Sequence, residues 1–311
     1  MPSGHARLGT GARLATLALL WGSGFLFIKI ALEGFTPYQI VLVRLALGAV
    51  VLLAFMLATN ESIPRDQLTW LHLGVAALLA NIVPYLLFAI AEQQIDSAVA
   101  GVINATTPLF TVIVAVLTRH EPRPARTRLV GLVIGIAGTV VLLAPWQSGT
   151  QFTSWGAVAA LAASLSYAAS YVYMDRYLVS RKLSPLSLSA SQLLAATAIT
   201  ALALPFTRDW TVPAWRLDAT LSLAALGILG TGVAYVLNYR IIADDGASAA
   251  SVVTYLLPVT AVILGAIVLD ETPTVHAIIG MLIVLAGVAL ARRGLVPRRA
   301  LAAADQRVGP P

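Results

Sequence analysis

Two cationic side chains, Lys29 and Arg44, lie inside long apolar segments of this 311-residue chain. A charge at the centre of a membrane span costs at least about 2.5 kcal/mol, so such residues normally face the protein interior or a cavity. Both cations could therefore receive a carboxylate. For Lys29 an alternative stays open, because its ammonium could extend to the membrane surface and pair with Glu33, one turn later. For Arg44 the alternative is a structural ion pair.

Aromatic and amide side chains recur at helical spacing around these cations. Trp21, Phe25 and Lys29 are each four residues apart, so they share one helical face. An aromatic wall with a few amides and hydroxyls suits a small amphipathic solute. We therefore predict a substrate cavity, with the alternative that tyrosines such as Tyr177 and Tyr239 belong to the membrane interface. The candidate substrate-binding residues are Trp21, Phe25, Lys29, Arg44, Asn81, Tyr85, Asn104, Tyr167, Tyr171, Tyr235 and Asn238.

The sequence argues against catalysis. It has no cysteine, so a thiolate nucleophile or a cysteine-bound metal is excluded. The four histidines lie near predicted span ends or in a tail, and no Asp or Glu is expected deep in a span. There is also no nucleophile motif, metal cluster or phosphate-binding loop. We expect neither an enzyme nor a cofactor or metal site, and we read the net charge of +6 as a topology signal rather than a nucleic-acid footprint.

The elements that must position these residues are membrane-spanning helices. The chain is 59% hydrophobic and 11% charged, with a mean hydropathy of +0.85, whereas a soluble domain carries roughly 25% charged residues. About 20 apolar residues are needed to span a membrane, and ten such segments predict an all-α polytopic membrane protein. They run near Leu14–Leu32, Pro37–Ala58, Leu68–Ile90, Ser97–Leu117, Leu129–Pro145, Trp155–Met174, Pro185–Pro205, Thr220–Tyr239, Ala247–Leu269 and Val275–Ala291.

The second half of the sequence repeats the first. Tyr85, Pro108 and Glu121 match Tyr235, Pro258 and Glu271 at one offset of 150 residues, and Pro37 matches Pro185 at 148. A duplicated unit with an odd number of spans has opposite orientations in its two copies, which is typical of secondary transporters. We therefore predict two inverted five-helix repeats, 14–145 and 155–291, around a central cavity, followed by a basic tail, 292–311.

Prolines and glycines add expectations about movement and packing. Pro108 and Pro258 lie in the middle of matching spans, where proline removes a backbone hydrogen bond, so a hinge is predicted alongside a purely structural kink. Small residues at helical spacing let two helices pack closely. This pattern occurs at Gly131, Gly135 and Gly138, and again at Gly280 and Gly287. Whether that contact is internal or joins two copies of the chain stays open, and a monomer satisfies the pattern.

Arginine and lysine residues predict the orientation in the membrane. If the N-terminus lies inside, the inner loops and tails carry most of the arginines, while the outer loops carry only Arg208 and Arg216. Positively charged loops stay on the cytoplasmic side. We expect a multi-pass protein of the bacterial cytoplasmic (inner) membrane with both termini cytoplasmic.

The combination of motifs resembles a known family. Trp21-Gly22-Ser23 with Lys29 on the same face, Pro37 followed by Arg44, and the repeated Pro-to-Glu spacing are similar to EamA-type transporters of the drug/metabolite transporter superfamily. The resemblance runs from about Leu14 to Arg292. It implies two inverted five-helix units around a cavity lined mainly by helices one, three, four, six, eight and nine, and export of amino acids or other metabolites without ATP. Among such proteins, exporters of aromatic and neutral amino acids look most similar.

These observations favour a secondary transporter that exports small neutral or aromatic amino acids or related metabolites by alternating access. A zwitterion needs a cation for its carboxylate, acceptors for its ammonium and an apolar wall, and the candidate residues provide all three. The alternatives are efflux of a drug or nucleoside-like metabolite and, in different classes, a polytopic lipid-modifying enzyme or a receptor-like scaffold. The expected partners are the small-molecule substrate and the lipid bilayer.

Overall fold

The computed structural model describes residues 9–95, 97–120, 124–144, 146, 154–181, 183–207, 213–268 and 274–293, and within these ranges the chain is helical, with no strand. The elements of the first half are α1 (Thr10–Gly22), α2 (Gly24–Ala31), α3 (Pro37–Thr59), α4 (Gln67–Ala77), η1 (Leu78–Ile82), α5 (Val83–Ala91), α6 (Ser97–Asn104), α7 (Thr107–Leu117) and α8 (Arg126–Leu143). Those of the second half are α9 (Trp155–Tyr177), η3 (Val179–Arg181), α10 (Pro185–Ala203), η4 (Leu204–Phe206), α11 (Leu217–Ala225), η5 (Leu226–Val233), α12 (Ala234–Asp245), α13 (Ala247–Ser251), α14 (Val253–Val268) and α15 (Val275–Arg293).

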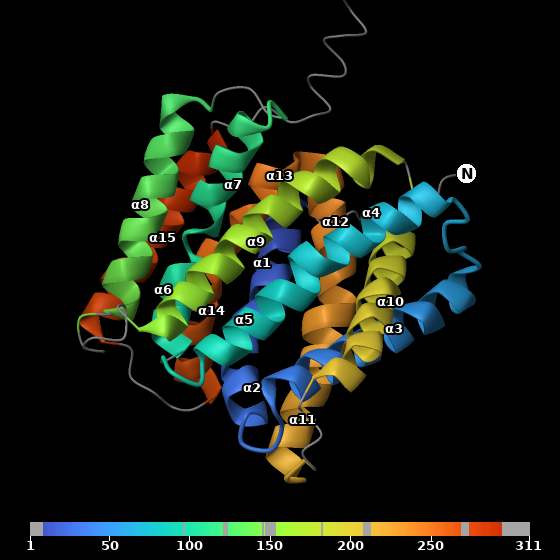
Figure 1. The fold of residues 1–311 in the computed structure, drawn as a ribbon. Helices are drawn as coiled ribbons and strands as arrows, with labels where there is room; N and C mark the ends of the chain where they lie inside the picture. Colours follow the sequence, from blue (N-terminus) through green and yellow to red (C-terminus); the bar gives the residue numbers. More distant parts are fainter. Residues whose placement is uncertain are drawn as a thin grey trace, which may run out of the picture.

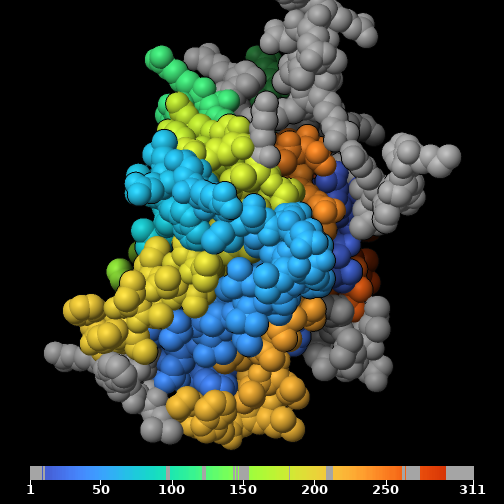
Figure 2. All heavy atoms as spheres, turned by 90° about the vertical axis from the view of Figure 1, so that its right-hand side faces the viewer, coloured from blue at the N-terminus to red at the C-terminus, as the bar shows by residue number. Residues whose placement is uncertain are grey.

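Seven of the described helical segments are long and apolar enough to cross a membrane, and two further apolar helices are shorter. The helices α3, α4, α10 and α11 form one continuous face of the molecule (Figure 2). Phe55, Leu57, Leu71 and Leu202 are exposed on these helices, as expected for side chains that contact lipid. The all-helical membrane architecture is confirmed, whereas the number of ten spans and the inversion of the repeats stay predictions.

Matching helices of the two halves begin in the same way. The Thr36 hydroxyl accepts a hydrogen bond from the Gln39 N–H at the start of α3, and the Ser184 hydroxyl does the same for Ser187 at the start of α10. In both helices proline follows the capping residue, where its missing N–H costs nothing. The shared Thr/Ser-Pro start therefore sets the same helix boundary in both halves.

Several predicted spans are interrupted near their middle. The first span breaks at Ser23 between α1 and α2, the fourth at Ala105–Thr106 between α6 and α7, and the ninth at Val252 between α13 and α14. Pro108 lies in the first turn of α7, just after its break, whereas Pro258 lies inside α14. The two prolines are thus both near a break, but only Pro108 is next to one.

The third and eighth spans each contain a π-helical segment, η1 and η5. A π-helix pairs each N–H with the carbonyl five residues back, so it changes which carbonyls are free, and such segments are frequent at functional sites. η1 shifted by 150 residues falls inside η5. The interruption is therefore a shared feature of the two halves.

The glycine stripes pack α8 against α15, and Figure 1 shows these two helices side by side at one end of the molecule. A Cβ at Gly131 would lie 2.3 Å from the Ala291 nitrogen, and one at Gly280 would lie 2.3 Å from the Leu142 nitrogen. Only glycine permits this approach of the backbones. The glycine contact left open by the sequence is internal to this chain.

Candidate functional site: a cavity between the two halves

A cavity lies between the two halves of the chain. It contains about 770 Å³ of space free of protein atoms, counted to its open mouth. Both halves contribute to it through α1, α2, α3, η1, α5, α6, α9, η5, α12 and α14. Of the residues predicted from the sequence, those that line it are Trp21, Phe25, Arg44, Tyr85, Asn104, Tyr167, Tyr171, Tyr235 and Asn238.

Arg44 is the cation of this cavity. Its guanidinium carbon lies 3.7 Å from the centre of the Tyr85 ring, and its Nε donates to the Thr231 hydroxyl at 3.1 Å. The side chain is only 6% exposed. Among the described residues, no carboxylate pairs with Arg44, so its terminal nitrogens Nη1 and Nη2 have no anionic partner. A buried guanidinium without a counter-charge is costly, and a planar anionic group on a ligand would supply the missing partner.

Small residues let Arg44 reach this position. A Cβ at Gly227, in η5, would lie 2.7 Å from the Leu47 Cβ and 3.1 Å from the Arg44 carbonyl. A Cβ at Gly48, one turn after Arg44, would lie 3.1 Å from the Gly227 carbonyl. Larger side chains at either position would push α3 away from η5. The glycines therefore hold the second span close enough for Arg44 to contact Thr231.

Lys29 lies elsewhere. Its exposed side chain donates from Nζ to the Glu92 carbonyl at 3.0 Å, at the end of α5, and it is not among the cavity-lining residues. Glu33, the partner considered for it, is 2.8 Å from Arg216. Phe25 lines the cavity on the same helix α2, and Lys29, one turn further along, reaches the Glu92 carbonyl instead.

Aromatic rings form most of the cavity wall. Trp21 contacts Tyr235 edge to face with centroids 6.3 Å apart, Phe25 meets Phe88 at 5.6 Å, and Tyr167 stacks on Phe88 at 6.0 Å. Such pairs keep the rings in fixed orientations. The wall is therefore a packed aromatic surface that an apolar or aromatic ligand can contact.

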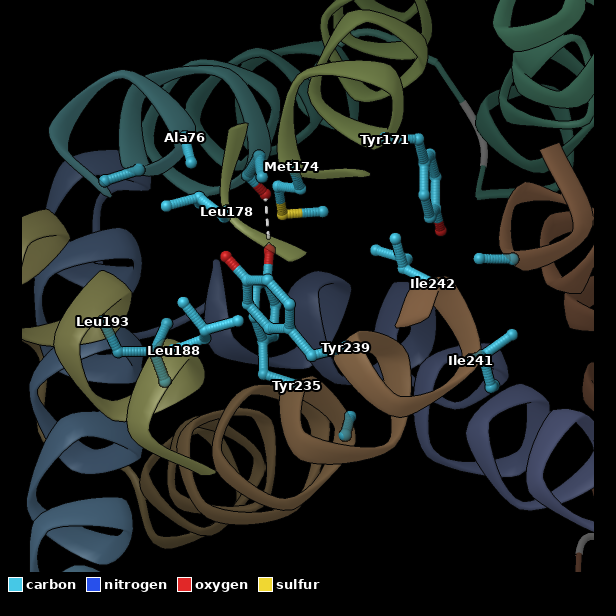
Figure 3. Close-up of a cluster of buried hydrophobic side chains, with 14 of the residues drawn as sticks. Ala76, Tyr171, Met174, Leu178, Leu188, Leu193, Tyr235, Tyr239, Ile241 and Ile242 are labelled. Atoms are coloured by element: carbon cyan, nitrogen blue, oxygen red, sulfur yellow. Dashed lines mark hydrogen bonds between the residues drawn. The ribbon is translucent and has the colours of Figure 1, made fainter. Parts of the chain in front are cut away.

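The interfacial interpretation fits Tyr177 and is wrong for Tyr239. Tyr177 is 37% exposed, whereas Tyr239 is fully buried and its hydroxyl contacts the Gln192 side-chain oxygen. Figure 3 shows the rings of Tyr235 and Tyr239 side by side in the interior. Tyr239 is one helical turn after Tyr235, so the two residues share the inward face of α12. The predicted span ended at Tyr239 and therefore placed this residue at the membrane surface, whereas α12 continues to Asp245.

Three amides occupy three different settings. Asn104 lines the cavity and accepts a hydrogen bond from the Thr107 hydroxyl. Asn238 also lines it, and its side-chain oxygen is buried without a donor among the described residues. Asn81 does not line the cavity; its oxygen accepts from Gln192 Nε2 at 2.6 Å. The cavity thus offers a free acceptor at Asn238, while Asn81 lies behind its wall.

The π-helical segments carry hydrogen bonds between the two halves. Trp21 Nε1 donates to the Gly230 carbonyl in η5 at 2.9 Å. In the opposite sense, the Ser166 hydroxyl donates to the Leu79 carbonyl in η1 at 2.7 Å, and the Tyr235 hydroxyl donates to the Ala80 carbonyl at 2.8 Å. Each half therefore donates to the π segment of the other, which fixes the cavity walls against each other.

Two acids are buried near the ends of spans, which does not contradict the expectation that no Asp or Glu lies deep in a span. Asp175 is buried within α9, two residues before its end, and its Oδ2 lies 2.7 Å from His120 Nε2. Glu92, directly after α5, is also buried. Both lie outside the cavity lining. Asp175 is helical because α9 continues past Met174, where the apolar segment was expected to end.

Sequence reasoning did not predict every residue in and around the cavity, and three of those it missed are informative. Phe88 and Ser170 line the cavity, and each is spaced at helical intervals from a residue that was found. Gln192 is buried behind the wall. The shift of 148 residues that relates Pro37 to Pro185 also relates Arg44 to Gln192, so the repeat contained a signal for this residue.

Comparison with known proteins agrees with this geometry. The model of the EamA-like transporter family matches residues 11–144 and again 154–293. The chain is 29% identical over 257 residues to "Uncharacterized inner membrane transporter YedA" of Escherichia coli K12, covering 81% of this chain and 80% of that protein. It is 28% identical over 271 residues to "Uncharacterized transporter YdfC" of Bacillus subtilis 168, covering 86% of each.

A solved crystal structure has the same fold. It superposes with a TM-score of 0.73 at 21% sequence identity, over 91% of this chain and 96% of the other. At that identity the likeness concerns the arrangement of helices and not the ligand.

Proposed function

The chain belongs to the EamA-like transporter family, whose model covers both of its halves, and from this premise we propose that it exports small neutral or aromatic amino acids or related metabolites. Transport would follow alternating access of the central cavity across the cytoplasmic membrane. The observation that carries the proposal is Arg44, a buried cation that borders an aromatic cavity and has no acidic partner in the described part of the chain.

The chemistry of the cavity supports an amino acid with an apolar side chain. Arg44 offers its terminal nitrogens to the carboxylate, in the bidentate arrangement that a guanidinium favours. The Asn238 oxygen, which has no donor, is a suitable acceptor for the ammonium. The aromatic wall of Trp21, Phe25 and Tyr167 then contacts the side chain of the ligand. Lys29 has no part in this arrangement.

Uptake into proteoliposomes tests the proposal. Purified protein would be reconstituted and supplied with a panel of labelled amino acids, with nucleosides and hydrophobic cationic drugs as the competing substrate classes. We expect uptake of phenylalanine and other neutral amino acids above that of protein-free vesicles. Uptake of only nucleosides or drugs would assign the cavity to those substrates, and the amino-acid proposal would be rejected.

The proposed location is the cytoplasmic membrane with both termini inside. The support is the arginine distribution in the sequence and the name of the Escherichia coli relative, an inner membrane transporter. A reporter that is active only in the cytoplasm should be active when it is fused to the C-terminal tail. Fusions at Arg65 and Gly149 should report opposite sides, and an external C-terminus would contradict the proposed orientation.

A further inference from the structure

Two equivalent hydrogen-bonded pairs connect the two halves of the chain. Arg44 of α3 donates to Thr231 of η5 at 3.1 Å, and Gln192 of α10 donates to Asn81 of η1 at 2.6 Å. The donors are 148 residues apart and the acceptors 150 residues apart, which are the offsets of the sequence repeat. In both pairs a polar residue of one half's second span binds the π segment of the other half. Gln192 with Asn81 is therefore the counterpart of Arg44 with Thr231.

The two hydrogen-bonded pairs differ in their access to the cavity. Arg44 lines the cavity, whereas Gln192 and Asn81 are both 0% exposed and do not. The residue before Asn81, Ala80, does line it. The Tyr235 hydroxyl donates to the Ala80 carbonyl, and the Tyr239 hydroxyl contacts the Gln192 oxygen. The second pair thus lies behind Tyr235, which forms a tyrosine wall of the cavity, while Tyr239 does not line the cavity and contacts Gln192 behind that wall.

The enclosed pair has an unused hydrogen-bond donor. Asn81 Nδ2 is buried and has no partner among the described residues. A buried amide group without a partner is unfavourable, so the pair is incomplete in this state. The free group is a donor, and its complement on a ligand is an acceptor oxygen.

We propose that Gln192 and Asn81 form a second ligand subsite, which takes an acceptor oxygen of the substrate when the tyrosine wall opens. The proposal rests on the transport function proposed above. The wall contains a contact between the halves, because Tyr235 belongs to the second and Ala80 to the first. Alternating access moves one repeat against the other, so it breaks contacts of this kind. The substrate then meets a cationic subsite at Arg44 and an uncharged one at Gln192.

An isosteric charge change tests the subsite. Asn81→Asp replaces the unpartnered nitrogen by an anionic oxygen, which repels the carboxylate of phenylalanine but accepts a hydrogen bond from the amide N–H of phenylalaninamide. In proteoliposomes, we expect the ratio of phenylalaninamide uptake to phenylalanine uptake to rise about tenfold, because charged hydrogen bonds are the stronger ones. Asn60→Asp is the matched control: Asn60 is exposed at the end of α3, and the ratio should stay at the wild-type value.

An exchange of side chains provides the second test. Arg44→Gln should lower phenylalanine uptake, and adding Gln192→Arg should restore part of it, because an arginine there can donate to Asn81 as Arg44 does to Thr231. Adding Thr197→Arg instead places the charge on another face of α10 and should restore nothing. Size-exclusion and melting profiles identify variants that fail to fold.

Each result decides between a subsite and a structural pair. If wild-type protein transports phenylalanine but Asn81→Asp leaves the ratio of phenylalaninamide uptake to phenylalanine uptake unchanged, or loses uptake of both ligands together, the second subsite is rejected and the transport function stands. If the exchange restores no more uptake than the Thr197→Arg control, the equivalence of Arg44 and Gln192 is rejected. If wild-type protein transports no amino acid, the proposed function fails first and the subsite falls with it.

Discussion

Replacing Arg44 by methionine should separate recognition of a charge from general damage to the cavity. In the free protein the guanidinium has one hydroxyl partner, Thr231, and one aromatic partner, Tyr85, and no acid among the described residues. With an amino acid bound, the carboxylate would take the terminal nitrogens. Truncating one member of a buried, hydrogen-bonded charge pair costs about 2–5 kcal/mol. We take about 3 kcal/mol, which corresponds to roughly a 150-fold loss of affinity for phenylalanine.

Two ligands show whether this loss comes from the carboxylate. Phenylalaninamide has the same ring and amine but no carboxylate, so its affinity should change by less than about threefold, or roughly 0.6 kcal/mol. Isothermal titration calorimetry on the detergent-purified protein measures both affinities. Arg44→Lys keeps the charge but lacks the planar guanidinium and its stacking on Tyr85. Its affinity for phenylalanine should therefore lie between those of the wild type and Arg44→Met.

The stability of the variant is a second readout. Methionine removes the contacts to Thr231 and Tyr85, but it also removes a buried charge that has no counter-ion, and these effects oppose each other. We expect the melting temperature to stay within about 3 °C of the wild type. Equal losses of affinity for phenylalanine and phenylalaninamide would refute the carboxylate assignment. A large fall in melting temperature would instead show that Arg44 is a structural residue.

Three further predictions concern other residues of the chain. Lys29→Met should leave phenylalanine uptake within about twofold of wild type, because an exposed ammonium on a carbonyl contributes little; a loss as large as that of Arg44→Met would contradict this. Gly131→Ala should destabilise the protein by about 1–3 kcal/mol in thermal unfolding, because its Cβ meets backbone at 2.3 Å. Gly74→Ala meets nothing within 4 Å and should be neutral or stabilising. Tyr85→Ala should reduce uptake more than Tyr177→Ala at equal expression, since only Tyr85 borders the cavity; equal reductions would remove Tyr85 from the site.

The sequence by itself determined the features that depend on local pattern. Apolar runs of membrane length are helical because the bilayer leaves no other way to pair the backbone, and the pairs Tyr85–Tyr235 and Pro108–Pro258 placed the two halves in register. The Thr-Pro and Ser-Pro starts of α3 and α10 follow from capping chemistry that acts within one turn. Nine of the eleven candidate residues line the cavity for the same reason: polar and aromatic side chains at helical spacing share an inward face.

Only the tertiary structure decided which cation faces the cavity. Lys29 and Arg44 are both basic residues in apolar spans, and no local rule separates them. Lys29 lies one turn beyond the cavity-lining Phe25 and donates to the Glu92 carbonyl at the end of α5, while Gly48 and Gly227 bring α3 against η5 and hold Arg44 at the cavity. Gln192 and Asn81, although related by the repeat to Arg44 and Thr231, lie behind Tyr235 and outside the cavity lining. Such positions depend on contacts between residues far apart in the chain, such as Arg44 with Thr231 and Gln192 with Asn81, and those two contacts exist only once the two halves have packed together.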